Sequence, residues 1–493
     1  MSPPPSPSGE AIKARSAARG LILLLVGLAV LRVAAAALIP LTEDEAYYRL
    51  WSQRLALGYY DHPPMIAWWI RAGVTLAGDD ALGVRLLPAL ANLAATVLVF
   101  DLGRTLSGPR LGLSGALLYN CTLTVGAAAA LAVPDAPAGL FWTAALWALA
   151  KAARDDRPRW WLAAGVMAGL ACLSKYSALF LAPGVALWLA ATPDGRRRLA
   201  QPWPWIAAAI ALGLFGANVA WNAQHHWQTF DKQFGRVAAS RLNPRYLAEL
   251  LAGQFVLLNP VVAILAMVGA GQAWRARAAA PVAWLMLAAI GPFLAYLLIH
   301  SLHDRVQAHW PVPLYSAAAI LAAWACEAGG WRVHLARWAP VGLALSVLAL
   351  AHAAAPATDL GQGDPARQLR GWPAFARAVD EERRASGAAW IGTQSYGVLA
   401  QIEAADPALP ALQIDERARY AALPQTVRPA PGQSGLIVDL RRRVDPAKLS
   451  ACFSGVKPLG DIDRDGGVGA DQRYAAVLVW APKVDLLGAG CAN

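Results

Sequence analysis

The segment Leu41–Met65 has the sequence LTEDEAYYRLWSQRLALGYYDHPPM and follows the first long apolar stretch of the chain. It combines acidic residues, aromatic residues and a His-Pro-Pro turn, and it is too polar to cross a lipid bilayer. Since long apolar stretches also follow it, we expect a loop that lies against a membrane surface. Chemistry on a membrane-bound substrate would take place in such a loop.

The composition indicates a polytopic membrane protein. Of the 493 residues, 57% are hydrophobic and only 15% are charged, and the mean hydropathy is +0.39. A soluble domain carries roughly a quarter charged residues. The formal net charge is +11, but no basic patch stands clear of the apolar segments, which argues against nucleic acid as a partner.

A transmembrane helix needs roughly 20 mostly apolar residues. The sequence therefore predicts a polytopic α-helical fold with about eleven spans, near residues 20–40, 84–103, 111–130, 134–151, 160–174, 177–192, 203–222, 248–271, 279–300, 310–327 and 338–355. Segments 43–57 and 64–77 are too short or too polar to span, and we expect interfacial helices there.

The distribution of basic residues predicts the orientation. Alternate connections carry Lys and Arg, as in the run Arg196–Arg198, and should face the cytoplasm together with the tail 1–19. The first apolar helix is expected to remain uncleaved. The opposite connections, including loop 41–83 and the tail from 356, hold six of the eight histidines. Function is therefore expected on the outer face of the inner membrane.

From about Pro356 the sequence becomes mixed and charged, and a small α/β extramembrane domain is predicted for 356–493. Strands are expected near 389–393, 435–440 and 474–480, with helices near 372–386 and 395–405. An oxidising compartment would permit a disulfide between Cys452 and Cys491. The other cysteines, which lack CxxC spacing, are expected to be buried packing residues: Cys121, Cys172 and Cys326.

Two explanations fit the sequence Thr42-Glu43-Asp44-Glu45. In the first, Thr42 caps a helix and Glu45 completes a capping box from the third helical position. In the second, a carboxylate at the membrane surface takes a proton from an acceptor hydroxyl or amine. Capping accounts for Glu45, but it does not explain why the motif lies beside the membrane and opens a helix that carries Tyr47, Tyr48 and Trp51.

Asp135 and Lys175 are two further candidates. Asp135 lies in Val133-Pro134-Asp135-Ala136-Pro137, where a simple helix start is the alternative to a catalytic carboxylate. Lys175 interrupts two adjacent apolar spans, and an ionisable residue at that depth is costly. It would either reach the interface with its flexible side chain or bind an anionic phosphate.

Loop 221–246 places several cations on the outer side, against the positive-inside trend, and these suggest an anionic substrate group: Lys232, Arg236, Arg241 and Arg245. The outer histidines, including His62 and His309, form no recognised metal-binding pattern. No cofactor is therefore expected, and a divalent metal has no support.

Several motifs occur in an order that resembles a known family. They are Asp44-Glu45, Gly58-Tyr59-Tyr60-Asp61-His62-Pro63-Pro64, Arg85-Leu86-Leu87-Pro88, Pro134-Asp135-Ala136-Pro137 and Leu173-Ser174-Lys175. Over about residues 20–325 the chain resembles the bacterial branch of the GT-C glycosyltransferases. This branch is related to protein O-mannosyltransferases and includes lipid A aminoarabinose and galacturonic acid transferases.

The resemblance implies inverting transfer from a polyprenyl-phosphate-linked sugar to lipid A or another periplasmic acceptor. It implies that Asp44 is the general base, that Glu45 supports its geometry and that Asp135 positions the acceptor or the base. Lys175 would hold the donor phosphate, assisted by Arg85 and by the basic loop with Arg236 and Arg241. Tyr59, Tyr60 and His62 would line the substrate or the interface.

Alternatives remain open for both the acceptor and the class of protein. The acceptor would be lipid A, lipopolysaccharide core or a protein hydroxyl, and a lipid-linked-sugar flippase is the rival outside the enzyme class. A transporter would place ionisable residues at mid-membrane and show repeat symmetry, which the sequence lacks. Asp61-His62-Pro63-Pro64 replaces the Lys-Pro-Pro expected of the aminoarabinose branch, which argues against that sugar.

Overall fold

A computed structural model describes residues 9–128, 131–235, 242–330, 332–356, 360, 364–420, 423, 427–464, 472–488 and 491. The chain divides into two compact units, each of which is considered by itself. The helical unit comprises Met1–Ala37, Asp61–Trp69 and Arg85–Leu350. The sheet unit comprises Leu38–Tyr60, Ile70–Val84 and Ala351–Asn493.

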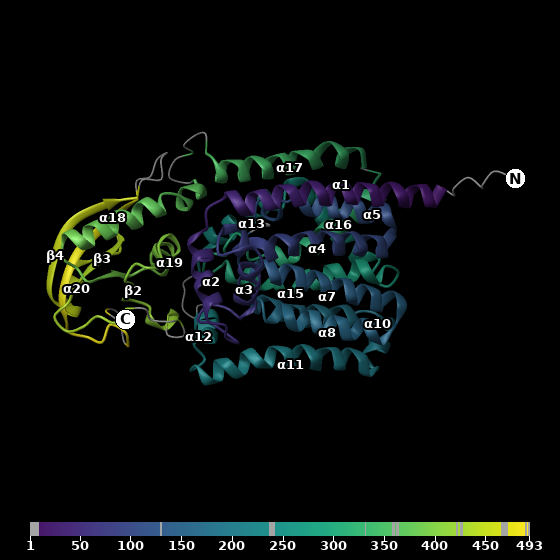
Figure 1. Ribbon diagram of the computed structural model, residues 1–493. Coiled ribbons are helices and arrows are strands. Elements are labelled where there is room, and N and C mark those ends of the chain that lie inside the picture. Colours follow the sequence, from purple (N-terminus) through teal and green to yellow (C-terminus); the bar gives the residue numbers. More distant parts are fainter. Residues whose placement is uncertain are drawn as a thin grey trace. The chain divides into compact units, whose positions relative to one another are not determined.

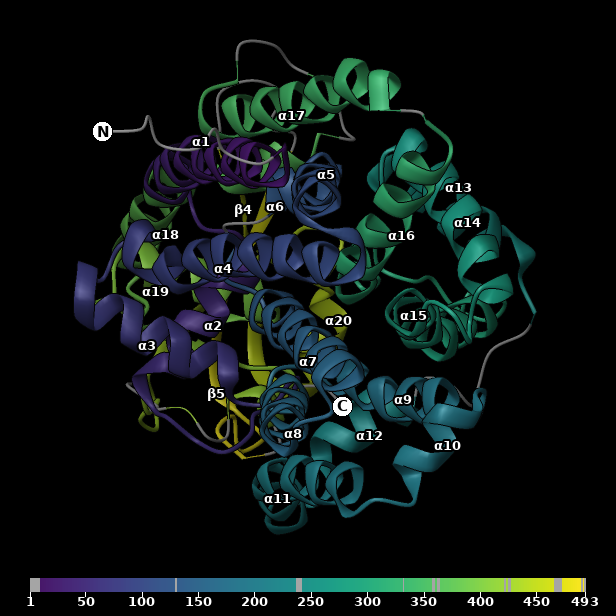
Figure 2. The ribbon, with the colours of Figure 1, turned by 90° about the vertical axis from the view of Figure 1, so that its right-hand side faces the viewer.

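Apolar helices build the helical unit (Figures 1 and 2). They are α1 (Gly9–Leu38), α4 (Ala81–Ser107), α5 (Pro109–Asn120), α6 (Leu123–Ala128), α7 (Asp135–Asp155), α8 (Pro158–Cys172), η1 (Tyr176–Phe180), α9 (Leu181–Ala190), α10 (Pro193–Leu199), α11 (Pro202–Gln224), α12 (Gln228–Phe234), α13 (Pro244–Leu257), α14 (Pro260–Arg275), α15 (Pro281–His300), η3 (Val312–Leu314), α16 (Tyr315–Ala328) and α17 (Arg332–Ala354). The first residues of α4 and the last of α17 belong to the sheet unit, as does most of α3 (Met65–Ala77).

Small residues allow these helices to approach closely. α8 packs against both α7 and α11, and the three run side by side in Figure 1. A Cβ atom at Gly165 of α8 would overlap the carbonyl oxygen of Ala207 in α11, and one at Gly269 of α14 would overlap that of Leu321 in α16. Close backbone approach replaces the hydrophobic driving force that helices lack in lipid.

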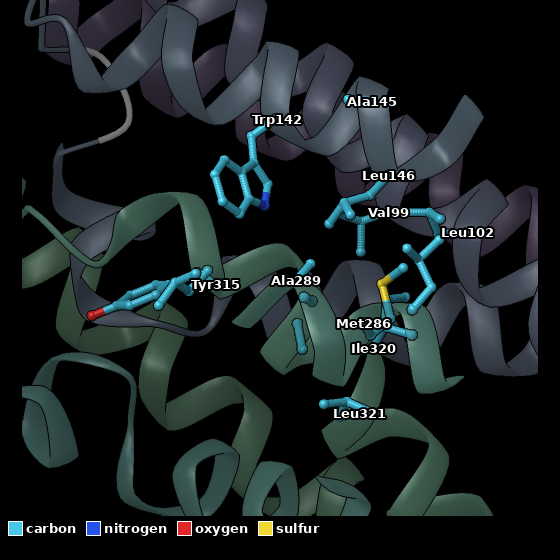
Figure 3. Close-up of a cluster of buried hydrophobic side chains, with 14 of the residues drawn as sticks. Val99, Leu102, Trp142, Ala145, Leu146, Met286, Ala289, Tyr315, Ile320 and Leu321 are labelled. Carbon is cyan, nitrogen blue, oxygen red and sulfur yellow. The ribbon is translucent and has the colours of Figure 1, made fainter. Parts of the chain in front are cut away.

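Figure 3 shows the buried centre of this unit. Val99 and Leu102 of α4 lie near Leu146 of α7, and Met286 of α15 and Ile320 of α16 complete the cluster. All five side chains are buried, so these four helices share one packed interior.

Four helical segments are long and apolar enough to cross a membrane: Arg15–Leu38, Ala81–Ser107, Pro202–Gln224 and Pro281–His300. The number rises to six if each of two sharply bent helix pairs within the described ranges counts as one span. The membrane character of the chain is thus supported, and the count of eleven spans stays a prediction.

The segment 248–271, expected to be one span, is interrupted. α13 ends at Leu257 and α14 begins at Pro260, with a bend of 103° between them. Asn259 has a φ of 73°, and its side chain accepts a hydrogen bond from the backbone of Val261. A proline disfavours helical geometry in the residue before it, which explains why the helix does not continue. The expected span 111–130 is likewise interrupted after Asn120, between α5 and α6.

The sheet unit contains a five-stranded sheet in the order β2-β1-β3-β5-β4. β1 (Trp390–Thr393) is parallel to both β2 (Ala411–Gln413) and β3 (Ser434–Leu440), whereas β5 (Arg473–Pro482) is antiparallel to β3 and to β4 (Phe453–Asp463). The helices are α2 (Glu43–Gln53), η4 (Pro365–Leu369), α18 (Trp372–Ala385), α19 (Tyr396–Ala405), η5 (Arg417–Arg419) and α20 (Pro446–Cys452).

The strands expected near 389–393, 435–440 and 474–480 are confirmed as β1, β3 and β5, and the two expected helices as α18 and α19. β2, β4 and α20 were not expected. The edge strand β4 alternates irregularly and is mostly exposed, so it lacks a clear apolar period. The domain boundary at residue 356 stays a prediction.

Helix α2 and the residues just before it pack against the C-terminal part of the sheet unit. α2 lies against α19, and Gln401 donates a hydrogen bond from Nε2 to the carbonyl oxygen of Leu41 at 2.8 Å. The ring centroids of Tyr47 in α2 and Tyr396 in α19 are 4.9 Å apart. Segments far apart in sequence therefore share one core.

A disulfide joins Cys452 at the end of α20 to Cys491. Their Cα atoms are 5.3 Å apart, within the range that a disulfide spans. Cys121, Cys172 and Cys326 are buried thiols, as expected of packing residues.

From the environment of Glu403 in α19 we predict that the free energy of unfolding depends on pH. Burial raises the pKa of Glu403 to about 7, and Arg49 of α2 opposes this increase. An acid with a raised folded-state pKa binds its proton more tightly in the folded state. Its contribution to stability is therefore full below the unfolded pKa of about 4.3 and is lost as the pH rises through about 7.

We expect Glu403→Gln to unfold at a higher temperature than the wild type at about pH 8 and at a similar temperature at about pH 4. Thermal unfolding of the full-length protein in detergent would measure both. Glu381→Gln, which changes an exposed carboxyl of α18, is the matched control and should show no such difference. Equal behaviour of the two variants would contradict the prediction.

Candidate active site

The N-terminus of α2 has the capping box expected from the sequence. The backbone N–H of Glu45 donates to Oγ1 of Thr42 at 3.2 Å, and Oε2 of Glu45 accepts from the backbone N–H of Thr42 at 3.0 Å. Glu45 is fully buried. Its carboxylate thus helps to fix the start of the helix, and any part in catalysis stays a prediction.

Asp44 is half-buried on the first turn of α2. Its Oδ1 accepts a hydrogen bond of 2.8 Å from the hydroxyl of Tyr396, the first residue of α19. The neighbouring Glu43 lies against Gly397, where a Cβ atom would overlap its carboxylate. Burial raises the pKa of Glu43, Arg464 lowers it and Asp44 raises it. The two carboxylates therefore have different surroundings.

Aromatic rings support this part of the loop. Tyr59 stacks on Trp51 with ring centroids 4.4 Å apart, and its hydroxyl lies 2.9 Å from the carbonyl oxygen of Arg54. Burial raises the pKa of Tyr59 to about 12. Tyr60 is half-buried, with the guanidinium of Arg419 5.3 Å from its ring centroid. Tyr59 thus holds the turn after α2, and sugar contacts by either tyrosine stay a prediction.

In the helical unit, Asp135 and Lys175 form an ion pair. Nζ of Lys175 lies 2.7 Å from Oδ1 of Asp135, and the two side chains are only 10% and 7% exposed. Nε2 of His309 lies 3.7 Å from Oδ2 of the same carboxylate. A buried charge needs such a partner because its transfer out of water is costly.

The backbone explains how the lysine reaches the aspartate. Asp135 begins α7 directly after Pro134. α8 ends at Cys172, and the amides of Ser174 and Lys175 both donate to the carbonyl oxygen of Ala171 at 3.0 Å. After this turn Lys175 has an extended backbone, and η1 begins at the next residue.

The His-Pro-Pro turn lies next to this pair. The amide of Met65 donates to the carbonyl oxygen of Leu173 at 3.1 Å, and Gln233 of α12 donates to the carbonyl oxygen of Asp61 at 2.6 Å. His62 contributes to the electrostatic environment of Asp135. The structure therefore brings together His62, Asp135 and Lys175.

The arginines predicted to assist the donor phosphate are Arg85, Arg236 and Arg241. Arg85 of α4 is fully buried, and its guanidinium donates to the carbonyl oxygen of Ala36 at 3.4 Å. Its contact with a donor phosphate stays a prediction. Arg236 and Arg241 lie outside the described residues. Asp44 belongs to the sheet unit and Asp135 and Lys175 to the helical unit, so each cluster is described within its own unit.

Within the described ranges, no group of three or more His, Cys, Asp or Glu side chains is arranged to hold a metal ion. The chemistry that these residues can supply is of two kinds. Lys175, whose side chain is nearly withdrawn from solvent, and a protonated His309, whose side chain is exposed, can bind an anion. The carboxylate of Asp44 can accept a proton.

The sequence did not lead us to predict a site role for Tyr396 or a contact between His309 and Asp135. Tyr396 follows the carboxyl end of a parallel strand, where functional side chains gather in α/β sheets, and this signal was present in the sequence. His309 was treated as an interfacial histidine because no local spacing pairs it with Asp135. Only the fold brings them together.

Comparison with known proteins supports the resemblance. Residues 61–221 match the family model described as dolichyl-phosphate-mannose-protein mannosyltransferase. The chain is 31% identical over 288 residues to the lipid A galacturonosyltransferase RgtD of Rhizobium johnstonii, covering 57% of this chain and 59% of that protein. It is 27% identical over 266 residues to the undecaprenyl phosphate-alpha-4-amino-4-deoxy-L-arabinose arabinosyl transferase 1 of Pseudomonas fluorescens, covering 50% of this chain and 46% of that protein.

The matched region thus spans about half the length of these curated relatives. Among solved structures, ArnT from Cupriavidus metallidurans bound to undecaprenyl phosphate has a similar fold, with a TM-score of 0.66 and 15% identity over 94% of this chain and 98% of that chain. The oligosaccharyltransferase AglB from Archaeoglobus fulgidus gives a TM-score of 0.51 and 12% identity, covering 96% of this chain and 77% of that chain.

The fold is therefore similar to that of ArnT, and several helices are long and apolar enough to cross a membrane. The partial family match and the two curated relatives are all to glycosyltransferases, which agrees with the GT-C resemblance drawn from the sequence motifs.

The buried pair predicts a coupled effect on stability. Lys175→Met leaves Asp135 charged and unpaired, and we expect a loss of about 3 kcal/mol in the free energy of unfolding. Asp135→Asn together with Lys175→Met should lose clearly less than the sum of the two single variants, because the double change leaves no buried charge. Denaturation in detergent would measure the cycle, and strict additivity would contradict the pairing.

Proposed function

We propose that this chain is an inverting glycosyltransferase. It transfers a sugar from a polyprenyl-phosphate donor to an acceptor at the periplasmic face of the bacterial inner membrane. The observation that carries this proposal is the buried pair of Lys175 and Asp135 with His309 beside it. The chain's relatives are named as a lipid A galacturonosyltransferase and as an undecaprenyl phosphate-aminoarabinose arabinosyl transferase.

Lys175 is proposed to bind the donor phosphate. An ammonium group held by one carboxylate keeps further N–H donors, and a phosphate oxygen would accept from them. Nearby cations stabilise the negative charge that develops on the phosphate as it leaves. His62, His309 and Arg85 are proposed to assist, as are Arg236 and Arg241 of the basic loop. The neighbouring ArnT structure holds undecaprenyl phosphate, which is consistent with this donor class.

A cavity in the helical unit supports a long apolar substrate tail. It has a volume of about 340 Å³ and is lined by α8, α9 and α11, including Trp161, Leu181 and Phe215. Cys172 and Ala178, on either side of Lys175 in the chain, also line it. We assign this cavity to part of the polyprenyl chain.

Asp44 is proposed as the general base. Its carboxylate takes the proton from the acceptor hydroxyl as the acceptor oxygen attacks the anomeric carbon of the sugar. The bond between that carbon and the phosphate oxygen breaks on the opposite side, and polyprenyl phosphate leaves. A single carboxylate suffices for this inversion. Glu45 would support the geometry of Asp44, and Asp135 would orient Lys175 or the acceptor.

Lipid A is the proposed acceptor because one curated relative is named as a lipid A galacturonosyltransferase. The other is named as an aminoarabinose transferase, an activity of the same lipid A-modifying branch according to the resemblance. Lipopolysaccharide core is the alternative acceptor of the same class. A uronic acid is the favoured sugar, since the more similar relative is a galacturonosyltransferase and His62 replaces the lysine expected of the aminoarabinose branch. Tyr59, Tyr60 and the outer aromatic residues would line the sugar or the interface.

A protein O-mannosyltransferase-like activity is the second candidate, because the matching family model carries that description. The region from residue 356 would form a periplasmic domain in either case, and the tail 1–19 would be cytoplasmic. A lipid-linked-sugar flippase is the weaker alternative. Reconstitution separates it from an enzyme, since a flippase moves its substrate without consuming it.

Asp44→Asn should lower transfer at least about a hundredfold, because it removes the proton acceptor and keeps the size of the side chain. Mass spectrometry of lipid A and core lipopolysaccharide from a deletion strain carrying each variant would measure the loss of a uronate- or hexose-sized mass. Asp80→Asn is the matched control, since Asp80 is an exposed aspartate of the same loop and should remain active.

Retention of the modification by Asp44→Asn would remove Asp44 as the base. A deletion strain with unchanged lipid A and core would exclude those acceptors and direct the search to glycoprotein. Equal folding of both variants is checked by their thermal unfolding in detergent.

Lys175→Met should raise the KM for the donor at least about tenfold, because the phosphate loses a charge-assisted hydrogen bond. Lys151→Met is the matched control, since Lys151 also pairs with a partly buried aspartate, Asp101, at 2.6 Å. Both variants disturb an ion pair, but only the first should weaken donor use. An equal change of KM in the two variants would contradict a phosphate-binding role.

A further inference from the structure

The carboxyl ends of β1 and β3 hold a rigid loop in the sheet unit. β1 ends at Thr393 and α19 begins at Tyr396, so only Gln394 and Ser395 separate them. Functional groups commonly gather at the carboxyl edge of parallel strands, where strand order changes direction. Here β1 lies between two parallel neighbours, and this loop leaves its carboxyl end.

Asp439 of β3 anchors the loop. Its Oδ2 accepts hydrogen bonds from the amides of Gln394 at 2.9 Å and Ser395 at 2.6 Å. Asp439 is fully buried, and burial raises its pKa to about 6. Gln413 of β2 makes a second hydrogen bond to the loop, since its Nε2 donates to the carbonyl oxygen of Gln394 at 2.8 Å. Side chains of β2 and β3 therefore fix the loop that directly precedes Tyr396.

The side chain of Tyr396 is also packed on more than one side. The guanidinium of Arg419 lies 4.5 Å from its ring centroid, and the ring of Tyr47 lies 4.9 Å away. The hydroxyl of Tyr420 donates to the backbone carbonyl of Tyr396 at 3.0 Å. The phenol has little freedom, and its hydroxyl donates to Oδ1 of Asp44 at 2.8 Å.

We propose that Tyr396 is a positioning residue for the general base: the C-terminal sheet region holds one oxygen of Asp44 through the Tyr396 hydroxyl and directs the other toward the acceptor. A carboxylate in the first turn of a surface helix otherwise rotates about its χ angles. Holding a reacting group in productive geometry supplies rate, because the orientation is established before reaction. Gly397 contributes by leaving room for Glu43 beside it.

This role gives the C-terminal region a part in catalysis beyond covering the loop, and it rests on the proposed function of Asp44 as base. Tyr396 would act only through Asp44 and would touch neither donor nor acceptor. Its loss should therefore lower kcat without changing the KM of either substrate.

The test compares Tyr396→Phe with Tyr474→Phe in the purified full-length protein in nanodiscs. Both changes remove one phenolic oxygen from the sheet unit, but the hydroxyl of Tyr396 donates to Asp44, whereas that of the buried Tyr474 in β5 lies 3.3 Å from Oε1 of Gln472. Undecaprenyl phosphate carrying galacturonic acid serves as donor, the aminoarabinose-carrying donor is assayed in parallel, and lipid A is the acceptor. Thermal unfolding checks that each variant is folded.

We expect Tyr396→Phe to lower kcat about tenfold, the effect of losing one hydrogen bond to a charged group, with both KM values unchanged. Tyr474→Phe should stay within about twofold of the wild type. In an Asp44→Glu background, where the carboxylate is already displaced, the effect of Tyr396→Phe should largely disappear.

Equal kcat values for the two tyrosine variants, or an undiminished effect of Tyr396→Phe in the Asp44→Glu background, would overturn the positioning role while leaving the base in place. Full activity of Asp44→Asn would overturn the base and the positioning role together. Absence of turnover by the wild type with both donors would contradict the proposed function itself.

Discussion

An ion pair nearly withdrawn from solvent joins Lys175, in the turn after α8, to Asp135 at the start of α7. Neither charge is tolerated alone in that environment, so each requires the other. Around it, α8 ends at Cys172, the amides of Ser174 and Lys175 bond to the carbonyl oxygen of Ala171, and the amide of Met65 after the His-Pro-Pro turn bonds to that of Leu173. Cys172 and Ala178, three residues before and after Lys175, line an apolar cavity, and we propose that the ammonium group binds the phosphate of a lipid whose tail enters this cavity.

The acidic start of α2 both caps a helix and presents a carboxylate to a residue far away in the sequence. Thr42 and Glu45 satisfy each other's backbone groups in a capping box, so the helix begins at a defined residue. This arrangement occupies Glu45 and leaves Asp44 directed to a different partner, Tyr396. Adjacent carboxylates thus have separate roles because the helix turns each side chain in its own direction.

The sheet unit contributes rigidity where a loop alone would have little. The sequence-distant segments 41–60 and 390–420 share aromatic contacts, and Asp439 fixes the loop that carries Tyr396. Loops positioned by a stable scaffold commonly carry functional residues. In this chain a small sheet is the scaffold, and the helix with the acidic motif packs against it.

Local sequence patterns are enough to predict the membrane character, the approximate positions of most long helices, the three central strands and the capping box at Thr42, because these follow from hydrophobicity, periodicity and short motifs. It also identified Asp44, Asp135 and Lys175 as chemically unusual for their positions. Only the tertiary structure decided that Lys175 reaches Asp135 across 40 residues, that His309 joins them and that Tyr396 bonds to Asp44 across 352 residues. It also decided the break before Pro260, where a local backbone preference overrides a continuous apolar pattern. Side-chain pairs so distant in sequence leave no local period, since their meeting depends on the packing of every element between them.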